Sequence, residues 1–232
     1  MRSERVAVIP SGGTLAAARR RAFGRLAGVT RPRRRDLVRL GSSYGGWWVP
    51  TAALRRGTIA YCAGAGEDIT FDLELLRRGC CVRTIDPTPR AIEHVASLGI
   101  RNNAFKFAPV AVWSRAETLR LYAPRDPSHV SHSVLNLQQT DGYIDVPAED
   151  LVDLMSRFGD RRIDLLKLDI EGAEYEVLGT LTRLAPLPQV ICVEFDQPQP
   201  IRRARSALRD LRELGYRPLL AEGFNVVLER AP

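Results

Sequence analysis

Residues 165–174 read Leu-Leu-Lys-Leu-Asp-Ile-Glu-Gly-Ala-Glu, an apolar run that ends in ionisable groups. A short apolar run with charges at its carboxyl end is typical of a buried parallel strand. In open α/β sheets, ligands bind at that edge of the sheet. Lys167, Asp169 and Glu171 are two positions apart, so on an extended backbone they share one face. The alternative is a salt-bridged strand end before a helix whose dipole favours acidic residues in its first turn.

Strand and helix patterns alternate along the chain from residue 58. The expected strands are 58–63, 80–85, 105–112, 163–169 and 190–195, and the expected helices are 68–78, 89–98, 148–157, 172–184 and 200–214. This alternation predicts βαβ units and a parallel sheet. The final runs, 217–221 and 224–228, are too close for a helical crossover and should form an antiparallel hairpin. Residues 113–147 break the rhythm with short strand patterns around a polar loop, and loops of this length are usually functional.

The length of 232 residues suits one α/β domain. We expect a helical or partly ordered, arginine-rich extension over residues 1–40 and the domain over residues 41–232. No apolar stretch reaches the roughly 18 residues that a membrane span needs, so no membrane partner is expected. The apolar patch at residues 6–10 is too short for a secretory leader. The four cysteines show no metal-ligand spacing, so we expect free thiols and a cytoplasmic protein.

The net charge of +7 comes almost entirely from arginine, since Lys106 and Lys167 are the only lysines. The arginines gather at residues 19–39 and 201–212. Such segments can bind nucleic acid, but residues 201–212 also have an apolar face at helical spacing, which a solvated helix explains. No aromatic residues alternate with the basic ones, so nucleic acid is not the expected partner.

A glycine turn, Gly64-Ala65-Gly66-Glu67-Asp68, lies between the first predicted strand and the first predicted helix. Glycines there let the backbone approach a ligand, and a helix N-terminus offers free N–H groups. Asp86 ends the next strand 20 residues after Gly66, the spacing at which a carboxylate reaches ribose hydroxyls. Together these features predict a cofactor that contains a nucleoside.

The composition of the glycine turn indicates which cofactor binds. A dinucleotide fold wants a third glycine where this chain has Ile69, and Glu67 and Asp68 would repel a pyrophosphate. An acidic turn suits a cofactor with a positive centre and an ammonium group, as in S-adenosylmethionine. The alternative makes Asp68 merely the N-cap of the helix.

The chain resembles the FkbM-type S-adenosylmethionine-dependent methyltransferases. The segments that carry the resemblance are Lys167 to Glu174, Gly64 to Asp72, Ile85 to Pro89, Val193 to Phe195 and Gly41 to Trp47. They cover roughly residues 40–230 in the family's order. The resemblance implies a class I methyltransferase fold, a Rossmann-like α/β architecture with three layers (αβα). Its seven-stranded sheet is mostly parallel with a reversed last strand, in agreement with the terminal hairpin.

The family's cofactor site maps onto this chain by position. The mapped positions are Gly64, Gly66, Asp68, Asp86, Val110 and Ala111, and their neighbours Ala63, Glu67 and Pro87 are also expected to bind the cofactor. Tyr44 is a further candidate for a cofactor or acceptor contact. Within this set Asp86 would hold the ribose, and Val110 and Ala111 would border the adenine. Many class I methyltransferases have an acidic residue two positions before the first glycine, where this chain has Cys62. Anchoring should therefore rely more on Asp68 and Asp86.

The candidate catalytic residues are Asp169, Lys167, Glu171 and His132. Methyl transfer is an in-line displacement, which needs an aligned acceptor and, for a hydroxyl, removal of a proton. Asp169 is the first candidate for the base or for orienting the acceptor, and Lys167 could tune it. Glu171 and Glu194 could complete a carboxylate cluster. Such a cluster leaves Mg²⁺ open, but without a diagnostic spacing no metal ligand is assigned.

His129 and His132 lie in the long polar loop, where a lid over the acceptor would sit. A histidine there suits proton removal near neutral pH. The alternative is an ordinary polar surface loop.

The leading hypothesis is a methyltransferase that acts on a hydroxyl of a small molecule, such as a sugar or a natural product. A second hypothesis is an RNA-directed methyltransferase or RNA-binding module that uses the basic residues 19–39. A third is a non-catalytic, cofactor-binding scaffold. The sequence does not identify the acceptor or the oligomeric state, and a homodimer is one possibility.

Overall fold

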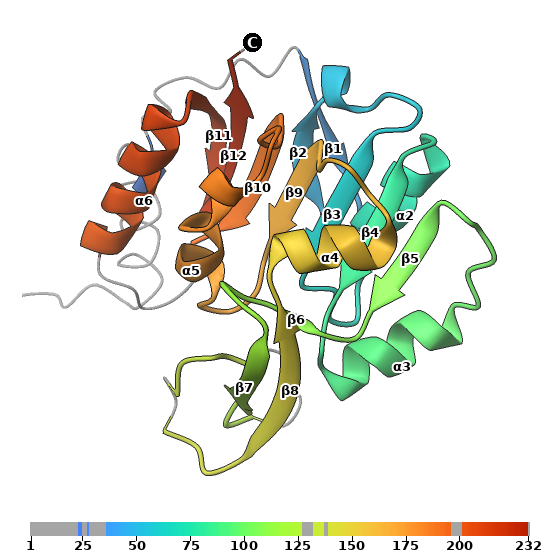
Figure 1. Cartoon of the computed structure of the whole chain (residues 1–232), viewed down its shortest axis with the longest axis vertical. Coiled ribbons are helices and arrows are strands. Elements are labelled where there is room, and N and C mark those ends of the chain that lie inside the picture. Colours follow the sequence, from blue (N-terminus) through green and yellow to red (C-terminus); the bar gives the residue numbers. More distant parts are fainter. Residues whose placement is uncertain are drawn as a thin grey trace, which may run out of the picture.

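The computed structural model describes residues 23, 24, 27, 36–126, 132–136, 139–195 and 201–231 (Figure 1). Its centre is a sheet of seven strands in the order β11-β12-β10-β9-β3-β4-β5. The strands are β3 (Ile59–Ala63), β4 (Cys81–Ile85), β5 (Phe105–Ala108), β9 (Leu165–Leu168), β10 (Val190–Glu194), β11 (Tyr216–Glu222) and β12 (Asn225–Arg230). Only β12 runs against the other six, which confirms the predicted sheet and its terminal hairpin.

Helices cover both faces of this sheet. They are α2 (Thr70–Arg77), α3 (Pro89–Ser97), α4 (Leu151–Phe158), α5 (Glu174–Leu178) and α6 (Ile201–Glu213), with 3-10 turns at Thr51–Ala53 and Leu181–Arg183. The apolar sides of α4, α5 and α6 pack on one face, and α2 packs on the other. Strand β9 shows why both faces are covered. Leu166 and Leu168 lie in the first core, under α4, α5 and α6, and Leu165 lies in the second core, under α2. The three-layer prediction is confirmed.

An antiparallel pair, β1 (Leu37–Leu40) and β2 (Trp47–Pro50), precedes the central sheet. Trp47 and Val49 are buried with residues of α2 in the second core. The expected helical extension is wrong where β1 overlaps it, because the alternating residues of this short strand pack on α2 and its neighbours. Most of residues 1–35 lies outside the described residues, and the domain boundary at residue 40 stays a prediction.

A second, three-stranded sheet lies below the carboxyl ends of the parallel strands in Figure 1. It contains β6 (Ala111–Val112), β7 (Glu117–Tyr122) and β8 (Tyr143–Glu149). The predicted strand 105–112 is wrong in being continuous, since the chain leaves the central sheet around Pro109, which has no N–H to donate. The helix predicted from residue 148 begins instead at Leu151. Its N-cap is Asp150, whose carboxylate accepts the N–H groups of Val152 and Asp153, each at 2.9 Å.

The helix predicted over residues 172–184 is also wrong in its extent. Helix α5 ends at Leu178, and a 3-10 turn follows at Leu181–Arg183. Thr180 donates its hydroxyl to the carbonyl of Val177 at 2.8 Å. Side chains that bond to the local backbone in this way compete with helix continuation, as does the glycine at position 179.

Candidate active site

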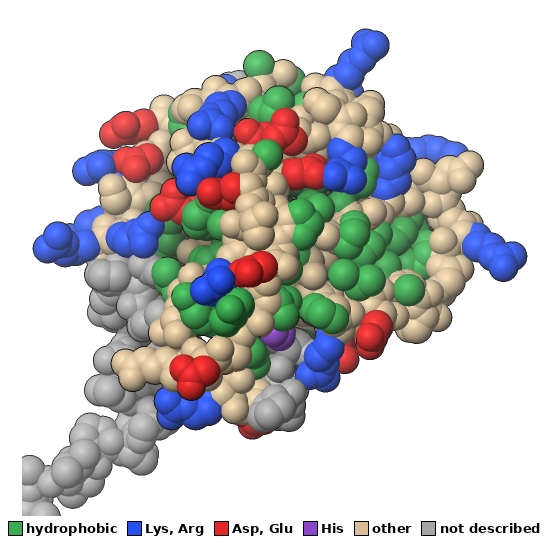
Figure 2. Space-filling model, turned by 60° about the horizontal axis from the view of Figure 1, so that its bottom comes forward, with side chains coloured by type: hydrophobic (Ala, Val, Ile, Leu, Met, Phe, Trp, Pro, Cys, Tyr) green, Lys and Arg blue, Asp and Glu red, His purple; other side chains and the backbone are tan. Residues whose placement is uncertain are grey.

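A cleft lies at the carboxyl ends of β3, β4 and β9, with the three-stranded sheet as its outer wall. Figure 2 views the molecule from this end and shows a hollowed face with hydrophobic side chains inside and charged ones around them. The predicted residues that line the cleft are Tyr44, Gly64, Gly66, Glu67, Asp68, Asp86, Pro87, Val110, Ala111, His132, Lys167, Asp169 and Glu171. Residues from six separate segments thus meet in one cavity.

Two predicted residues do not line the cleft. Ala63 is fully buried in β3, where its carbonyl accepts the N–H of Asp169 at 3.2 Å. Glu194, at the end of β10, is also absent from the lining. His129 lies outside the described residues.

The glycine turn requires glycine for two reasons. Gly64 and Gly66 have φ values of 88° and 51°, in the left-handed region that L-residues rarely adopt. A Cβ on Gly64 would lie 1.8 Å from the carbonyl oxygen of Asp169. The backbones at the ends of β3 and β9 therefore touch. The glycine turn is in direct contact with the backbone of Asp169, the first candidate for the base.

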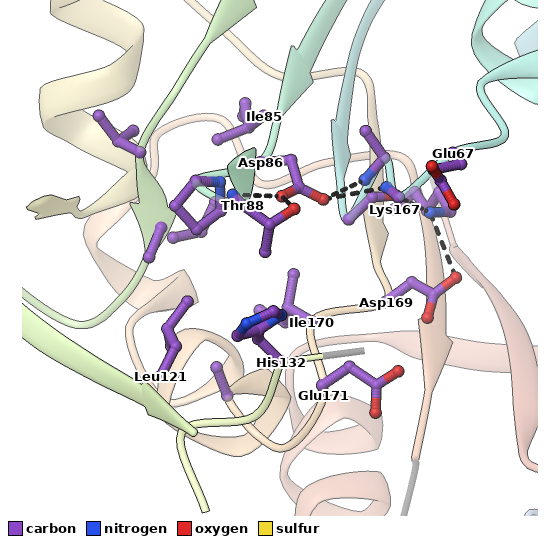
Figure 3. A pocket seen from close by; sticks show the side chains of 18 of the residues that line it. Glu67, Ile85, Asp86, Thr88, Leu121, His132, Lys167, Asp169, Ile170 and Glu171 are labelled. Carbon is purple, nitrogen blue, oxygen red and sulfur yellow. Dashed lines mark hydrogen bonds and ion pairs between the residues drawn. The ribbon is translucent and has the colours of Figure 1, made fainter. Parts of the chain in front are cut away.

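The Asp86 carboxylate is buried and braces the glycine turn (Figure 3). Its Oδ2 accepts the N–H groups of Ala65 at 2.8 Å and Gly66 at 3.0 Å. Its Oδ1 accepts the N–H and the hydroxyl of Thr88 at 2.8 and 2.6 Å. An ionised carboxylate has about four acceptor positions, and all are used. A ribose hydroxyl would have to replace one of these donors, of which the Thr88 hydroxyl is the one free to rotate.

The Asp68 carboxylate is occupied in the same way. It accepts the Ser42 hydroxyl, the Gly45 N–H at 3.2 Å, and the N–H and hydroxyl of Thr70 at 2.9 and 2.6 Å. Partial burial opposes ionisation, but the bonds from Ser42, Thr70 and Gly45 together hold the pKa of Asp68 below its usual value. Asp68 thus ties the β1–β2 turn, which carries the 84% exposed Tyr44, to the glycine turn.

Lys167 connects the glycine turn to Asp169. The side chain is buried, and its Nζ donates to the Gly64 carbonyl at 2.6 Å and pairs with Asp169 at 3.3 Å. Burial alone would lower the pKa of Lys167, but the charges of Asp169 and Asp72 raise it above its usual value. The raised pKa favours the ammonium form of Lys167, so this side chain is not a candidate for the base.

Asp72 was not expected in this network. It lies on the buried side of α2 and accepts the Thr84 hydroxyl at 2.5 Å. Burial raises the pKa of Asp72 to about 6, although the charge of Lys167 opposes the rise. An acidic residue next to Phe71, on the apolar side of a predicted helix, was the sequence signal for it.

The predicted acceptor side of the cleft is a turn between β9 and α5. It places Asp169 and Glu171 beside the cavity, which His132 also lines (Figure 3). Glu171 has a φ of 52° and Gly172 a φ of 102°. The Ser133 hydroxyl, from the outer wall, donates to the Glu171 carbonyl at 2.6 Å. Ser133 is a second residue that sequence reasoning missed, because the contact joins segments far apart in the chain.

The lining suits S-adenosylmethionine in charge. On the predicted cofactor side, carboxylate residues line the cleft at Glu67, Asp68 and Asp86, and they would suit a cofactor with a sulfonium centre and an ammonium group. The lining also has an apolar part that would suit the predicted adenine ring, at Ile85, Pro87, Val110 and Ala111. Within the described part of the chain, no three His, Cys, Asp or Glu side chains gather as a metal site, and no helix is long and apolar enough to cross a membrane.

Residues 53–218 match the sequence model of the family described as Methyltransferase FkbM domain, which covers more than half of the chain. The chain belongs to the FkbM methyltransferase family. The predicted family and its S-adenosylmethionine-dependent methyltransferase activity are thereby confirmed. Among curated proteins, no sequence matches this FkbM-family chain at a significant level.

Solved structures similar to this FkbM-family chain are distant. The fibrillarin pre-rRNA processing protein of Methanococcus jannaschii has a TM-score of 0.42 and 10% identity, over 76% of this chain and 66% of that one. The chain therefore spans just under two thirds of that relative. A putative caffeoyl-CoA O-methyltransferase from Staphylococcus aureus has a TM-score of 0.40 and 8% identity, with coverage of 96% and 84%. A Burkholderia thailandensis 1,6-didemethyltoxoflavin-N1-methyltransferase with bound S-adenosylhomocysteine has a TM-score of 0.38 and 14% identity, with coverage of 97% and 91%.

Proposed function

We propose that this FkbM-family enzyme methylates a hydroxyl of a small, uncharged molecule, such as a sugar or a natural product. The observation that carries the proposal is the backbone contact between Gly64 and Asp169. Because of it, the candidate base lies directly beside the glycine turn. S-adenosylmethionine supplies an electrophilic methyl group, so the protein has only to align the acceptor and remove its proton.

The cleft supplies residues for two tasks in this proposal, binding the cofactor and activating the acceptor. Gly64 and Gly66 let the backbone approach the cofactor, and the apolar surface at Val110 and Ala111 receives the adenine. Asp169 accepts the hydroxyl proton or orients the hydroxyl, and the Lys167 ammonium holds the Asp169 carboxylate in place. His132 faces the same cavity from the outer wall and is the alternative base.

The charge of the cleft bears on the kind of acceptor. Asp169 and Glu171 line the acceptor side, and the buried Lys167 ammonium is already committed to Gly64 and Asp169. A phosphate-rich acceptor would meet these carboxylates, and the described lining residues include no arginine that could bind a phosphate. This supports a neutral acceptor over RNA.

Calorimetric titration with S-adenosylmethionine and turnover of Asp169→Asn test the proposal. We expect kcat to fall about 10²–10⁴-fold, since general acid–base catalysis contributes that much. The affinity for the cofactor should change less than about threefold, because Asp169 is outside the predicted cofactor contacts. Turnover is followed as release of S-adenosylhomocysteine from a panel of neutral glycosides and their phosphorylated forms.

Three results would contradict the proposal. A folded protein that gives no heat with S-adenosylmethionine would remove the cofactor. Unchanged turnover of Asp169→Asn would exclude Asp169 from the mechanism. Turnover of RNA that falls steeply with salt would favour the RNA-directed alternative, which rests on the basic residues 19–39.

A further inference from the structure

Glu174 is a fully buried carboxylate directly behind the acceptor-side turn. It is the first residue of α5, with none of its surface exposed, and it does not line the cleft. Its Oε1 accepts the N–H of Ile170 at 2.9 Å, and its Oε2 accepts the N–H of Gly172 at 3.0 Å. One side chain thus holds two backbone donors on either side of Glu171.

The turn that Glu174 holds is one the backbone does not adopt readily. Glu171 and Gly172 are consecutive residues with positive φ, and a side chain at Glu171 makes that conformation costly by about 1–2 kcal/mol. Strained residues of this kind persist only where their surroundings fix them. The surroundings here are the Glu174 carboxylate and the Ser133 hydroxyl on the Glu171 carbonyl.

We propose that Glu174 is a positioning residue for methyl transfer. Its carboxylate holds residues 169–172 in the conformation that presents Asp169 and Glu171 to the acceptor. This inference rests on the proposed function for its catalytic consequence, but the hold itself is a property of the folded protein and can be measured without any reaction.

A carboxylate is required at this position because there are two donors to satisfy. Glutamine would offer one oxygen and would turn an NH₂ group toward the second backbone N–H. A buried donor left without an acceptor destabilises the conformation that buries it. Glutamine at position 174 should therefore release one end of the turn while preserving the size of the side chain.

Ionisation of Glu174 should give the positioning role a dependence on pH. Burial raises the pKa of Glu174 to about 7, and the nearby charge of Asp169 adds to the rise, while the bonds from Ile170 and Gly172 oppose it. Tyr175, the next residue of α5, also interacts electrostatically with Glu174. A protonated carboxyl loses acceptor capacity. While Glu174 stays buried in the folded protein, its bonds to the two amides should therefore strengthen as the pH rises through about 7, although ionising a buried carboxyl lowers the free energy of global unfolding.

The test compares Glu174→Gln with Glu176→Gln, a matched change on the same helix at a side chain that is 47% exposed and pairs with Arg203. Hydrogen exchange of the Ile170 and Gly172 amides reports the hold directly. We expect exchange to be at least about tenfold faster in Glu174→Gln, since one lost hydrogen bond of about 1.4 kcal/mol gives that factor. Glu176→Gln should match the wild type.

Catalysis provides the second readout. In Glu174→Gln, kcat should fall about 10²-fold, as a small misplacement of reacting groups does, while the KM for S-adenosylmethionine stays within about threefold. The rise of wild-type kcat through pH 7 should disappear in Glu174→Gln and persist in Glu174→Asp. The aspartate variant keeps the charge but reaches only one amide, so it also covers the case in which Glu174→Gln does not fold.

The outcomes separate the two proposals. Wild-type exchange and wild-type kcat in both position-174 variants would overturn the role of Glu174. Faster exchange in these variants, in a protein that does not bind S-adenosylmethionine, would support the hold of the turn and contradict the proposed function. Equal losses of kcat in Glu174→Gln and Glu176→Gln would show a general effect on α5 and would also overturn the positioning role.

Discussion

The two sides of the cleft use carboxylates differently. On the cofactor side, Asp68 and Asp86 line the cavity, yet each has its acceptor positions filled by donors of the protein. On the acceptor side the tasks are divided, since Asp169 and Glu171 line the cavity while the buried Glu174 holds the turn from behind. The difference suggests that the cofactor side must exchange internal hydrogen bonds to bind its ligand, whereas the acceptor side can bind without giving up its support.

The largest expected effect comes from a steric clash introduced where the two sides of the cleft are in contact. Gly64→Ala should destabilise the protein by more than about 4 kcal/mol, because the new Cβ would lie 1.8 Å from the Asp169 carbonyl oxygen. Gly57→Ala is the matched control, with a φ of 83° but no atom within 4 Å of the new Cβ. It should lose only about 1–2 kcal/mol, the cost of the left-handed backbone alone. Denaturant unfolding measures both, and equal losses would mean that the two sides are not in contact.

The next effect is the contribution of Glu174, which supports the acceptor side, to the pH dependence of the free energy of unfolding. Since the folded-state pKa of Glu174 is raised from 4.5 to about 7, the unfolded chain releases this proton first as the pH rises. The free energy of unfolding should therefore fall between pH 4.5 and 7, by about 2–3 kcal/mol from this group. Glu174→Gln should lose that part of the pH dependence, and Glu176→Gln should keep it. Identical pH dependence in wild type and Glu174→Gln would contradict the assignment.

The smallest effect tests the exchange of hydrogen bonds on the cofactor side. Thr88→Val removes one donor from Asp86 and frees an acceptor position beside the cleft. If a ribose hydroxyl takes that position, affinity for S-adenosylmethionine should rise about three- to tenfold, the value of one hydrogen bond. Thr180→Val is the control, since Thr180 is equally buried, at 8% exposure, but bonds to Val177 away from the cleft. Unchanged or weaker binding by Thr88→Val would place the ribose elsewhere.

The sequence predicted the sheet well because the central strands are short, mostly apolar runs that alternate with helical patterns, and this alternation depends little on distant contacts. It failed for β1 and β2, which are short and are stabilised by packing on α2. It also failed at residues 172–184, where Thr180 bonds to the local backbone and α5 stops. Packing between distant segments decided the first case, and a local side-chain bond that competes with the helix decided the second.

The sequence predicted many of the residues that line the candidate site, but it did not predict the hydrogen bonds between them. Residues at the carboxyl ends of parallel strands had to meet, so Gly64, Asp86 and Asp169 came together as expected. That Asp86 would turn toward the glycine turn could not be foreseen, because its donors come from a backbone that only the fold brings within reach. The role of Glu174 was hidden for the same reason, since it depends on two positive φ values in the preceding turn.

The ammonium group of Lys167 has a thermodynamic consequence. It bonds at once to the Gly64 carbonyl, on the cofactor side, and to the Asp169 carboxylate, on the acceptor side. A ligand that shifts either partner alters the bond that remains for the other. Linkage then requires reciprocity, so the factor by which the methyl donor changes the affinity for the acceptor equals the factor by which the acceptor changes the affinity for the donor. One buried amine thus gives the two substrates a shared term in their binding free energies.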